Sequence, residues 1–310
     1  CRTYFICDHI FVQCNFKIYF NAIGKEFKLM DKRKLEENFF KVIMGACTLV
    51  IVGSLFMILW TIISKGINSL TWDLVTKAPE GGFYIGKGGG IVNAIIGSVY
   101  ITLGSTLLGL VISIPIVLYI NVYAKKKSRL VAVTRLAFDV LFGIPSIVYG
   151  AFGFTIMVML GLKTSLLAGI VTVTLLIIPI LVRAMDEVMR TIPFELADAT
   201  YALGATRWET GKVLLRQCTP GILTAILLSF GRAIGDAACV LFTAGYTDNI
   251  PTSLSQPAAT LPLAIFFQLS SPIQEVQERA YGAALILTII VLIISIGAKY
   301  FSKKLSKNKI

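Results

Sequence analysis

Two oppositely charged residues stand alone in a long apolar stretch of the C-terminal half. Arg232 and Asp236 are the only charged residues of segment 217–247. Their i,i+4 spacing predicts that they share one face of a helix and pair with each other. A charge inside a membrane span costs roughly 2.5–3.5 kcal/mol, so both side chains are expected to face protein or a water-filled path.

The guanidinium group of Arg232 suits the recognition of an oxyanion, because its planar fork can donate to two oxygens at once. This chemistry predicts a substrate pathway at Arg232 and Asp236. The alternative is an ion pair that only locks a helix bundle. Arg135 and Asp139 repeat the spacing at the edge of another apolar stretch, and there we favour the structural interpretation.

The polar segment 183–216 is the longest one between apolar stretches. Pro193 suits the first position of a helix, and acidic residues after it favour the positive helix end. Gly204 suits the left-handed residue that ends a helix. A short helix with small side chains would fit a groove on another protein, whereas a solvated connector is the alternative. The candidate docking residues are Glu195, Asp198, Ala199, Thr200 and Gly204.

A glycine-rich stretch, 81–87, has the spacing of a phosphate-binding loop, but Gly88 follows where Ser or Thr would bind Mg²⁺. We interpret it as a loop and expect no ATP site, and so no cofactor, on this chain. No histidine follows Met30, and we find no cluster of Cys, His or carboxylates with metal-ligand spacing. We therefore expect neither a metal site nor catalytic residues, which argues against an intramembrane enzyme.

The composition predicts an all-α membrane protein. Hydrophobic residues make up 56% of the chain and charged residues 15%, against roughly half and a quarter in soluble domains. Apolar stretches of about 20 residues cross the ~30 Å hydrocarbon layer as helices, because only helices and closed barrels satisfy the backbone in lipid. We predict six transmembrane helices in a single domain, 30–310, with its core at about 91–300. The expected spans are 42–63, 91–124, 140–162, 164–182, 217–247 and 280–298.

The net charge of +12 is distributed unevenly. Basic residues gather before the first expected span, between the second and third, between the fourth and fifth, and after the sixth. Loops rich in Lys and Arg stay in the cytoplasm. The pattern predicts a multi-pass protein of the cell membrane with both termini cytoplasmic, and it disfavours nucleic-acid binding.

Residues 1–29 differ in character from the rest of the chain. They contain the only histidine, His9, and they precede Met30 and the basic run that leads into the first span. Codons for Lys25-Glu26 can form a ribosome-binding sequence just before Met30. We predict that 1–29 are a non-native or upstream-translated extension; the alternative is a genuine cytoplasmic arm.

Several motifs are similar to those of known transport proteins. The sequence D-A-T-x-x-x-G-A at 198–205 resembles the E-A-A-x-x-x-G-A loop of ABC importer permeases, with Asp198 in place of Glu and Thr200 in place of Ala. Three further segments resemble phosphate importer permeases, and the resemblance extends over about residues 30–301. These segments are G-I-P-S-I-V-Y-G at 143–150, R-A-I-G-D-A-A at 232–238 and L-P-L-A-I at 261–265.

The resemblance implies a type I ABC importer permease fold and a transport subunit that performs no chemistry. The loop containing Asp198 would be the coupling helix that inserts into a cytoplasmic ATPase dimer, which binds ATP and Mg²⁺. A homologous permease would complete the pathway, and an extracytoplasmic binding protein would deliver phosphate. A carboxylate at Asp236 could accept a hydrogen bond from HPO₄²⁻, which sulfate cannot donate. The alternatives are a permease for molybdate or sulfate and, in another class, a secondary transporter or channel, although we find no paired inverted halves.

Overall fold

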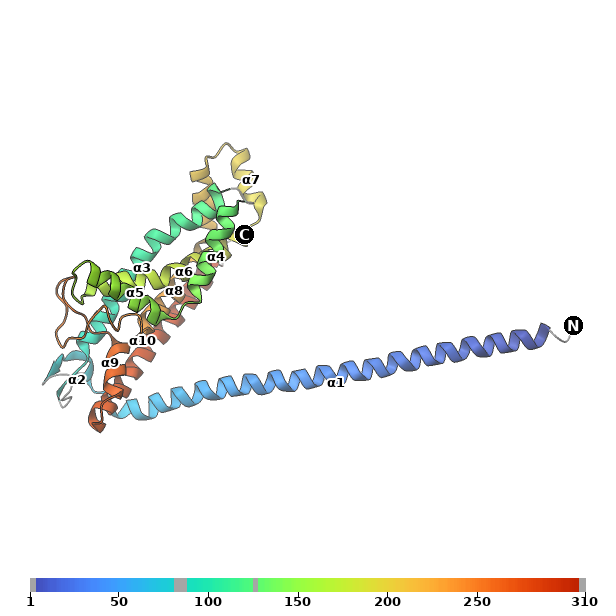
Figure 1. Cartoon of the computed structure of the whole chain (residues 1–310), viewed down its shortest axis with the longest axis horizontal. Coiled ribbons are helices and arrows are strands. Elements are labelled where there is room, and N and C mark those ends of the chain that lie inside the picture. Colours follow the sequence, from blue (N-terminus) through green and yellow to red (C-terminus); the bar gives the residue numbers. More distant parts are fainter. Residues whose placement is uncertain (1–3, 81–87, 125–127, 307–310) are drawn as a thin grey trace. The chain divides into compact units, whose positions relative to one another are not determined.

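The computed structural model describes residues 4–80, 88–124 and 128–306. These residues form helices, short connections and one antiparallel pair of two-residue strands. The chain divides into two compact units, Cys1–Thr61 and Ile62–Ile310, which can be followed by colour in Figure 1. The all-helical fold class expected from the composition is confirmed.

The first unit consists of helix α1 (Tyr4–Gly66) up to Thr61. This helix contains most of a candidate membrane span, Glu36–Ser69. An apolar stretch of this length is long enough to cross the hydrocarbon layer. Residues 4–29 continue the same helix, and their origin as an upstream-translated extension stays a prediction.

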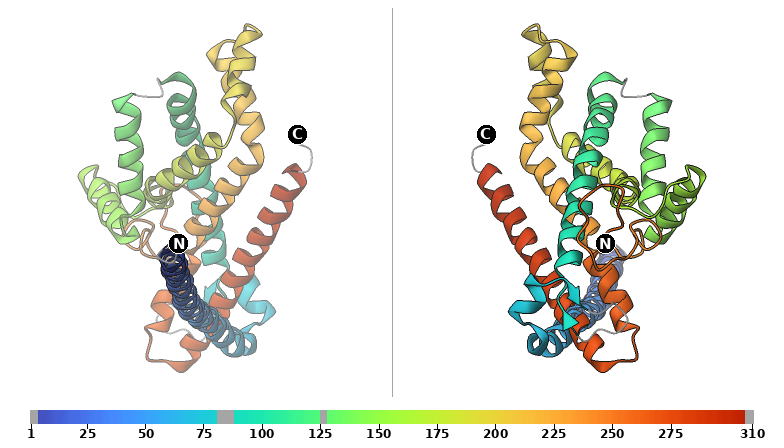
Figure 2. Two further views of the ribbon diagram at one scale, coloured as in Figure 1. Left: turned by 90° about the vertical axis from the view of Figure 1, so that its right-hand side faces the viewer. Right: turned by 90° about the vertical axis from the view of Figure 1, so that its left-hand side faces the viewer.

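The second unit contains the remaining elements and is drawn from two sides in Figure 2. Helices α3 and α6 form its centre, α8 packs against both of them, and α10 packs against α8 and α9. The elements in chain order are η1 (Ile67–Ser69), α2 (Trp72–Thr76), β1 (Pro79–Glu80), β2 (Gly88–Gly89), α3 (Val92–Leu118), η2 (Tyr119–Tyr123), α4 (Arg129–Phe142), α5 (Ser146–Met159), α6 (Leu166–Arg190), α7 (Phe194–Ala202), α8 (Arg207–Gly235), α9 (Leu261–Leu269) and α10 (Gln274–Ser306).

Close packing of α3 depends on small residues. Ser98, Thr102 and Ser105 are buried on one face of this helix. At Gly97 a Cβ atom would lie 2.0 Å from the carbonyl oxygen of Ala259, so only glycine allows this approach. Small residues at helix contacts are typical of membrane proteins, where packing rather than apolar burial holds helices together.

The third expected span, 140–162, is not one helix. Helices α4 and α5 meet at an angle of 101°, with the break at 143–145. Pro145 lacks an N–H and disfavours helical geometry in the residue before it. The hydroxyl of Tyr149 donates to the carbonyl of Leu141 across the bend at 2.9 Å. Within the part of the chain that the structure describes, five helices can cross a membrane, or six if this bent pair counts as one span.

The fifth expected span, 217–247, is also shorter as a helix than predicted, because α8 ends at Gly235. An irregular segment follows until α9 begins at Leu261. Its carbonyl at Thr243 accepts from the amide of Ser165, and the amide of Ala258 donates to the carbonyl of Ala244. Irregular backbone is tolerated at membrane depth where protein buries it and satisfies its hydrogen bonds. The buried parts of segment 236–260 meet this condition through α6 and the segment's own turns, whereas residues 252–256 are exposed.

Candidate functional site

The segment between α6 and α8 folds as the sequence predicts. Pro193 is the residue before α7 rather than its first residue, and Gly204 ends the turn after α7 with φ +83°. Helix α8 then begins with a capping box, in which the backbone amide of Thr206 donates to Glu209 at 2.8 Å and the Glu209 amide donates back to the threonine hydroxyl at 3.4 Å. Both boundaries are therefore determined locally.

The five candidate docking residues do not all have the same surroundings. Glu195, Asp198, Ala199 and Gly204 are exposed, whereas Thr200 is half-buried. The Thr200 hydroxyl lies 2.7 Å from the carbonyl of Ala197 and 3.1 Å from the hydroxyl of the buried Thr210 on α8. Thr200 therefore fixes α7 against α8, and the other four present an open surface.

The ion pair between Arg232 and Asp236 is confirmed, with 3.3 Å between Nη2 and Oδ2. Its expected setting is corrected: Asp236 is the residue that follows α8, with extended backbone, and not a member of the helix. The other carboxylate oxygen accepts from the amide of Cys239 at 2.9 Å. The Arg232 side chain is 55% exposed and that of Asp236 only 5%. The carboxylate is thus the fixed partner, and the guanidinium is the accessible one.

An exposed face of α8 leads to Arg232. Thr224, Leu228 and Arg232 are exposed on successive turns, and no atom lies within 4 Å of a Cβ built on Gly231 or Gly235. This face is open within a helix that is long and apolar enough to span a membrane. Because lipid is a poor solvent for a guanidinium group, the face calls for a protein partner or a water-filled path over it.

A second polar cluster lies at the end of α6 that leads to α7, and the sequence analysis missed it. Asp186 is buried and accepts from Arg135 at 2.9 and 3.0 Å and from Asn121 at 2.8 Å. Asp139 pairs with Arg183 of α6. Arg135 and Asp139 of α4 thus form ion pairs with residues of α6. They do not pair with each other, which is what their i,i+4 spacing had suggested. The structural interpretation remains, with different partners.

The position of Asp186 gives a signal that sequence reading could have used. It falls four residues after Val182 and three before Met189, and all three are buried. A carboxylate on the buried stripe of a helix requires donors from neighbouring elements. Periodicity alone could therefore have predicted that Asp186 has partners, although not which ones.

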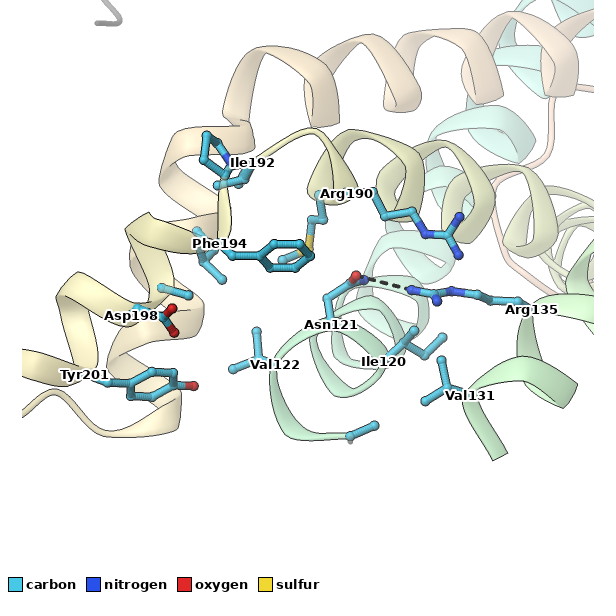
Figure 3. Close-up of a pocket in the computed structure, with 15 residues that line it drawn as sticks. Ile120, Asn121, Val122, Val131, Arg135, Arg190, Ile192, Phe194, Asp198 and Tyr201 are labelled. Atoms are coloured by element: carbon cyan, nitrogen blue, oxygen red, sulfur yellow. Dashed lines mark hydrogen bonds between the residues drawn. The ribbon is translucent and has the colours of Figure 1, made fainter. Parts of the chain in front are cut away.

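A cavity of about 390 Å³ lies beside this cluster, between α7 on one side and η2, α4 and the end of α6 on the other. Figure 3 shows Asn121, Arg135 and Arg190 on one side, and Phe194, Asp198 and Tyr201 of α7 on the other. The Arg135 guanidinium donates to the side-chain oxygen of Asn121 at 3.4 Å. The cavity separates α7 from α4, so that α7 joins the bundle through α6 and α8.

Comparison with known proteins agrees with these features. Residues 113–307 match the family described as "binding-protein-dependent transport system inner membrane component". The chain belongs to this family. It is 35% identical to the phosphate transport system permease protein PstA of Pasteurella multocida, over 90% of this chain and 97% of that protein. The PstA protein of Yersinia pestis is 34% identical over 89% and 96% of the two chains. The resemblance to phosphate importer permeases is confirmed.

Solved structures of two ABC transporters share the fold. The chain matches a structure titled as an inward-facing conformation of the MetNI methionine ABC transporter, with a TM-score of 0.59 and 21% identity. The match covers 69% of this chain and 95% of the other. A histidine-bound amino acid ABC transporter gives a TM-score of 0.52 at 16% identity, over 69% and 92%. The expected ABC permease fold is confirmed, and the chain is an integral membrane protein.

Two kinds of site were expected to be absent: an ATP site at the glycine-rich stretch and a metal site. The glycine-rich stretch 81–87 lies outside the described residues. Among the residues that the structure describes, no group of three or more His, Cys, Asp or Glu side chains is arranged to hold a metal ion.

Proposed function

We propose that this chain is the permease subunit of an ATP-driven phosphate importer in the cell membrane. The observation that carries the proposal is its similarity to PstA proteins over nearly their full length. Similarity that extends from end to end favours the same role for the whole chain rather than for one shared module. The accessible guanidinium group on α8 adds a chemical reason, because it suits an oxyanion.

Arg232 and Asp236 are the residues proposed to meet the anion. Arg232 can turn two nitrogens toward phosphate oxygens because more than half of its side chain is exposed. Asp236 keeps its place through the Cys239 amide and can accept a hydrogen bond from the protonated oxygen of HPO₄²⁻. Sulfate has no such proton at neutral pH, so the carboxylate would repel it. Attraction by one residue and repulsion by the other together favour phosphate.

Partner proteins are proposed to hydrolyse ATP, to complete the pathway and to deliver phosphate. A cytoplasmic ATPase dimer, which binds ATP and Mg²⁺, is proposed to receive α7 through Glu195, Asp198, Ala199 and Gly204. A homologous permease would cover the open face of α8, and an extracytoplasmic binding protein would supply phosphate. The chain itself is proposed to carry no cofactor and no catalytic residue. The distribution of basic residues supports cytoplasmic termini.

Transport by a purified complex tests the proposal. The chain would be produced together with a homologous permease, an ATPase and a phosphate-binding protein from the same organism, and the complex would be reconstituted in proteoliposomes. We expect ATP-dependent uptake of radiolabelled phosphate that unlabelled sulfate and molybdate fail to compete. Uptake of sulfate or molybdate in preference to phosphate would identify a permease for another oxyanion, and uptake without ATP would indicate a secondary transporter or channel.

A further inference from the structure

Helix α4 is attached to the bundle largely through charged groups. Within α4, which the structure describes throughout, Val131 is buried and most other apolar side chains are exposed. Two ion pairs join it to α6, one between Arg135 and Asp186 and one between Asp139 and Arg183. With so little buried apolar surface, α4 depends on the pair at the buried Asp186 for its attachment to α6, because the Asp139–Arg183 pair is nearly half exposed and adds little.

Asp186 is the centre of this attachment. Its Oδ1 accepts from Asn121 at 2.8 Å and from Arg135 Nη2 at 3.0 Å, and its Oδ2 accepts from Arg135 Nε at 2.9 Å. Arg190 Nε lies 3.3 Å from the same Oδ2. The donors come from η2, α4 and α6, and the carboxylate is 3% exposed. A buried carboxylate with charge-assisted bonds to three elements holds them in one arrangement.

The cluster around Asp186 lies near the junction between α6 and α7, where a displacement of α7 would be transmitted to the other helices. Asp186 is one turn before the end of α6 at Arg190, and 191–193 lead directly into α7. The cavity in Figure 3 leaves α7 without close packing on α4. A displacement of α7 is therefore transmitted to α4 through the last residues of α6, from Asp186 to Arg190.

From α4, a series of contacts continues through α5 to the Arg232–Asp236 ion pair at the end of α8. The Tyr149 hydroxyl bonds to Leu141 across the bend between α4 and α5. One residue later, a Cβ on Gly150 would lie 2.8 Å from the carbonyl oxygen of Ala238, so α5 lies directly against the segment after α8. The amide of Cys239 in that segment donates to Asp236. Each step is a direct contact between described residues.

We propose that Asp186 is a positioning residue for transport, which ties α4 to the end of α6 beside α7 so that displacement of α7 reaches Asp236 through α4 and α5. The proposal rests on the proposed function, in which α7 meets the ATPase and Asp236 meets the anion. Coupling between distant sites requires such a contiguous set of elements or an equilibrium that both sites bias.

Replacement of Asp186 in the complete reconstituted transporter tests this proposal. Asp186→Asn removes the negative charge with little change in shape, and Glu187→Gln is the matched control, because Glu187 is the exposed neighbour on the same helix. Phosphate import and ATP hydrolysis are measured in the same vesicles. We expect Asp186→Asn to lower the phosphate imported per ATP by about tenfold and Glu187→Gln to leave it unchanged. An equal ratio in both variants would overturn the proposal.

A distance measurement separates this proposal from the proposed function. Spin labels on the exposed Val133 of α4 and the exposed Leu292 of α10 report whether nucleotide binding by the ATPase moves α4. We expect a nucleotide-dependent change in wild type and in Glu187→Gln, and its loss in Asp186→Asn; an unchanged response would overturn the role of Asp186. If the wild-type complex imports no phosphate, the proposed function fails, but this distance still decides the role of Asp186.

A second variant covers the case in which Asp186→Asn does not fold. Arg135→Lys keeps the positive charge but removes the two-nitrogen contact with Asp186. It is expected to lower the same ratio by a smaller factor and to reduce the same distance change. Normal values of both quantities in Arg135→Lys would contradict the proposal.

Discussion

The side chains of Arg232 and Asp236 differ in how firmly they are held, and this difference gives each residue a separate role. Asp236 is buried and bonded to the Cys239 amide, whereas Arg232 is more than half exposed. An arginine held by one contact at 3.3 Å can exchange that partner for an anion at small cost, because exposed ion pairs contribute little stability. A fixed carboxylate beside it then adds selectivity without needing to move.

Arg232→Lys is expected to lower phosphate uptake by about tenfold or more, because one charge-assisted hydrogen bond is worth roughly 1.5–3 kcal/mol. Lysine keeps the charge but loses the fork. Uptake of radiolabelled phosphate, normalised to the amount of protein in the membrane, measures the effect. Arg207→Lys, at the start of α8, is the control for a general loss of arginine geometry.

A double variant decides between a pathway and a structural lock. Arg232→Leu with Asp236→Asn removes both charges while the asparagine oxygen still accepts from Cys239. The single change Arg232→Leu strands a buried carboxylate, which costs ~3–5 kcal/mol where burial is complete. A pathway role predicts that the double variant folds and imports no phosphate. Near-normal import by this variant would show that the pair is only structural.

At the scale of elements, the loop from α6 to α8 is the part that sequence reading predicted best. The sequence predicted a short helix with Pro193 at its first position and a stop at Gly204, and the structure has α7 at Phe194–Ala202 with Gly204 after it. The capping box at the start of α8 was not predicted, although it forms between residues only three positions apart. The break between α4 and α5, at Pro145, was not predicted. The presence of proline permits a bend, but its size depends on what the two arms pack against.

Ala199→Arg is expected to uncouple ATP hydrolysis from transport. Ala199 is exposed on α7, so the larger side chain leaves the bundle intact but cannot seat in a groove of the ATPase. ATPase activity of the complex should lose its dependence on phosphate import while membrane insertion stays normal. Glu187→Arg places the same side chain on α6 instead and should leave coupling intact. Normal uptake and normal ATPase binding by Ala199→Arg would remove the docking role.

Gly97→Val tests the packing of α3 against the segment before α9. A Cβ at this position overlaps the carbonyl of Ala259, and overpacking typically costs about 1–3 kcal/mol. We expect a lower midpoint of thermal unfolding for the purified protein. Gly297→Val on α10, where no atom lies within 4 Å of a Cβ at this position, is the matched control. Equal midpoints for the two variants would contradict this account of α3.

At the scale of the whole molecule, the distribution of charge predicts how the chain lies in the membrane. Helix α7 is at one end of the second unit and α2 is at the other, as Figures 1 and 2 show. Basic residues gather on both sides of α7, at 183–190 and 207–216. The positive-inside rule then places α7 in the cytoplasm and α2 outside.

Labelling of single cysteines measures this orientation. In a background without the native cysteines, Leu203→Cys after α7 should react only with reagents that reach the cytoplasm. Glu275→Cys at the start of α10 should react only from outside. Both positions are exposed, so reactivity reports the side of the membrane and not burial. Labelling of Leu203→Cys from outside would contradict the predicted topology.

The sequence by itself determined the membrane class, the number of apolar stretches, the loop around α7 and the resemblance to phosphate permeases. These features depend on composition, on length against the thickness of a bilayer, or on motifs within a few residues. Only the tertiary structure decided the end of α8, the 101° bend after α4 and the choice of Asp186 as the partner of Arg135. Arg135 and Asp186 are far apart in the chain, and a residue's own spacing cannot show which distant carboxylate will be buried beside it. The local partner Asp139 was the better guess from spacing, and packing of α4 on α6 overruled it.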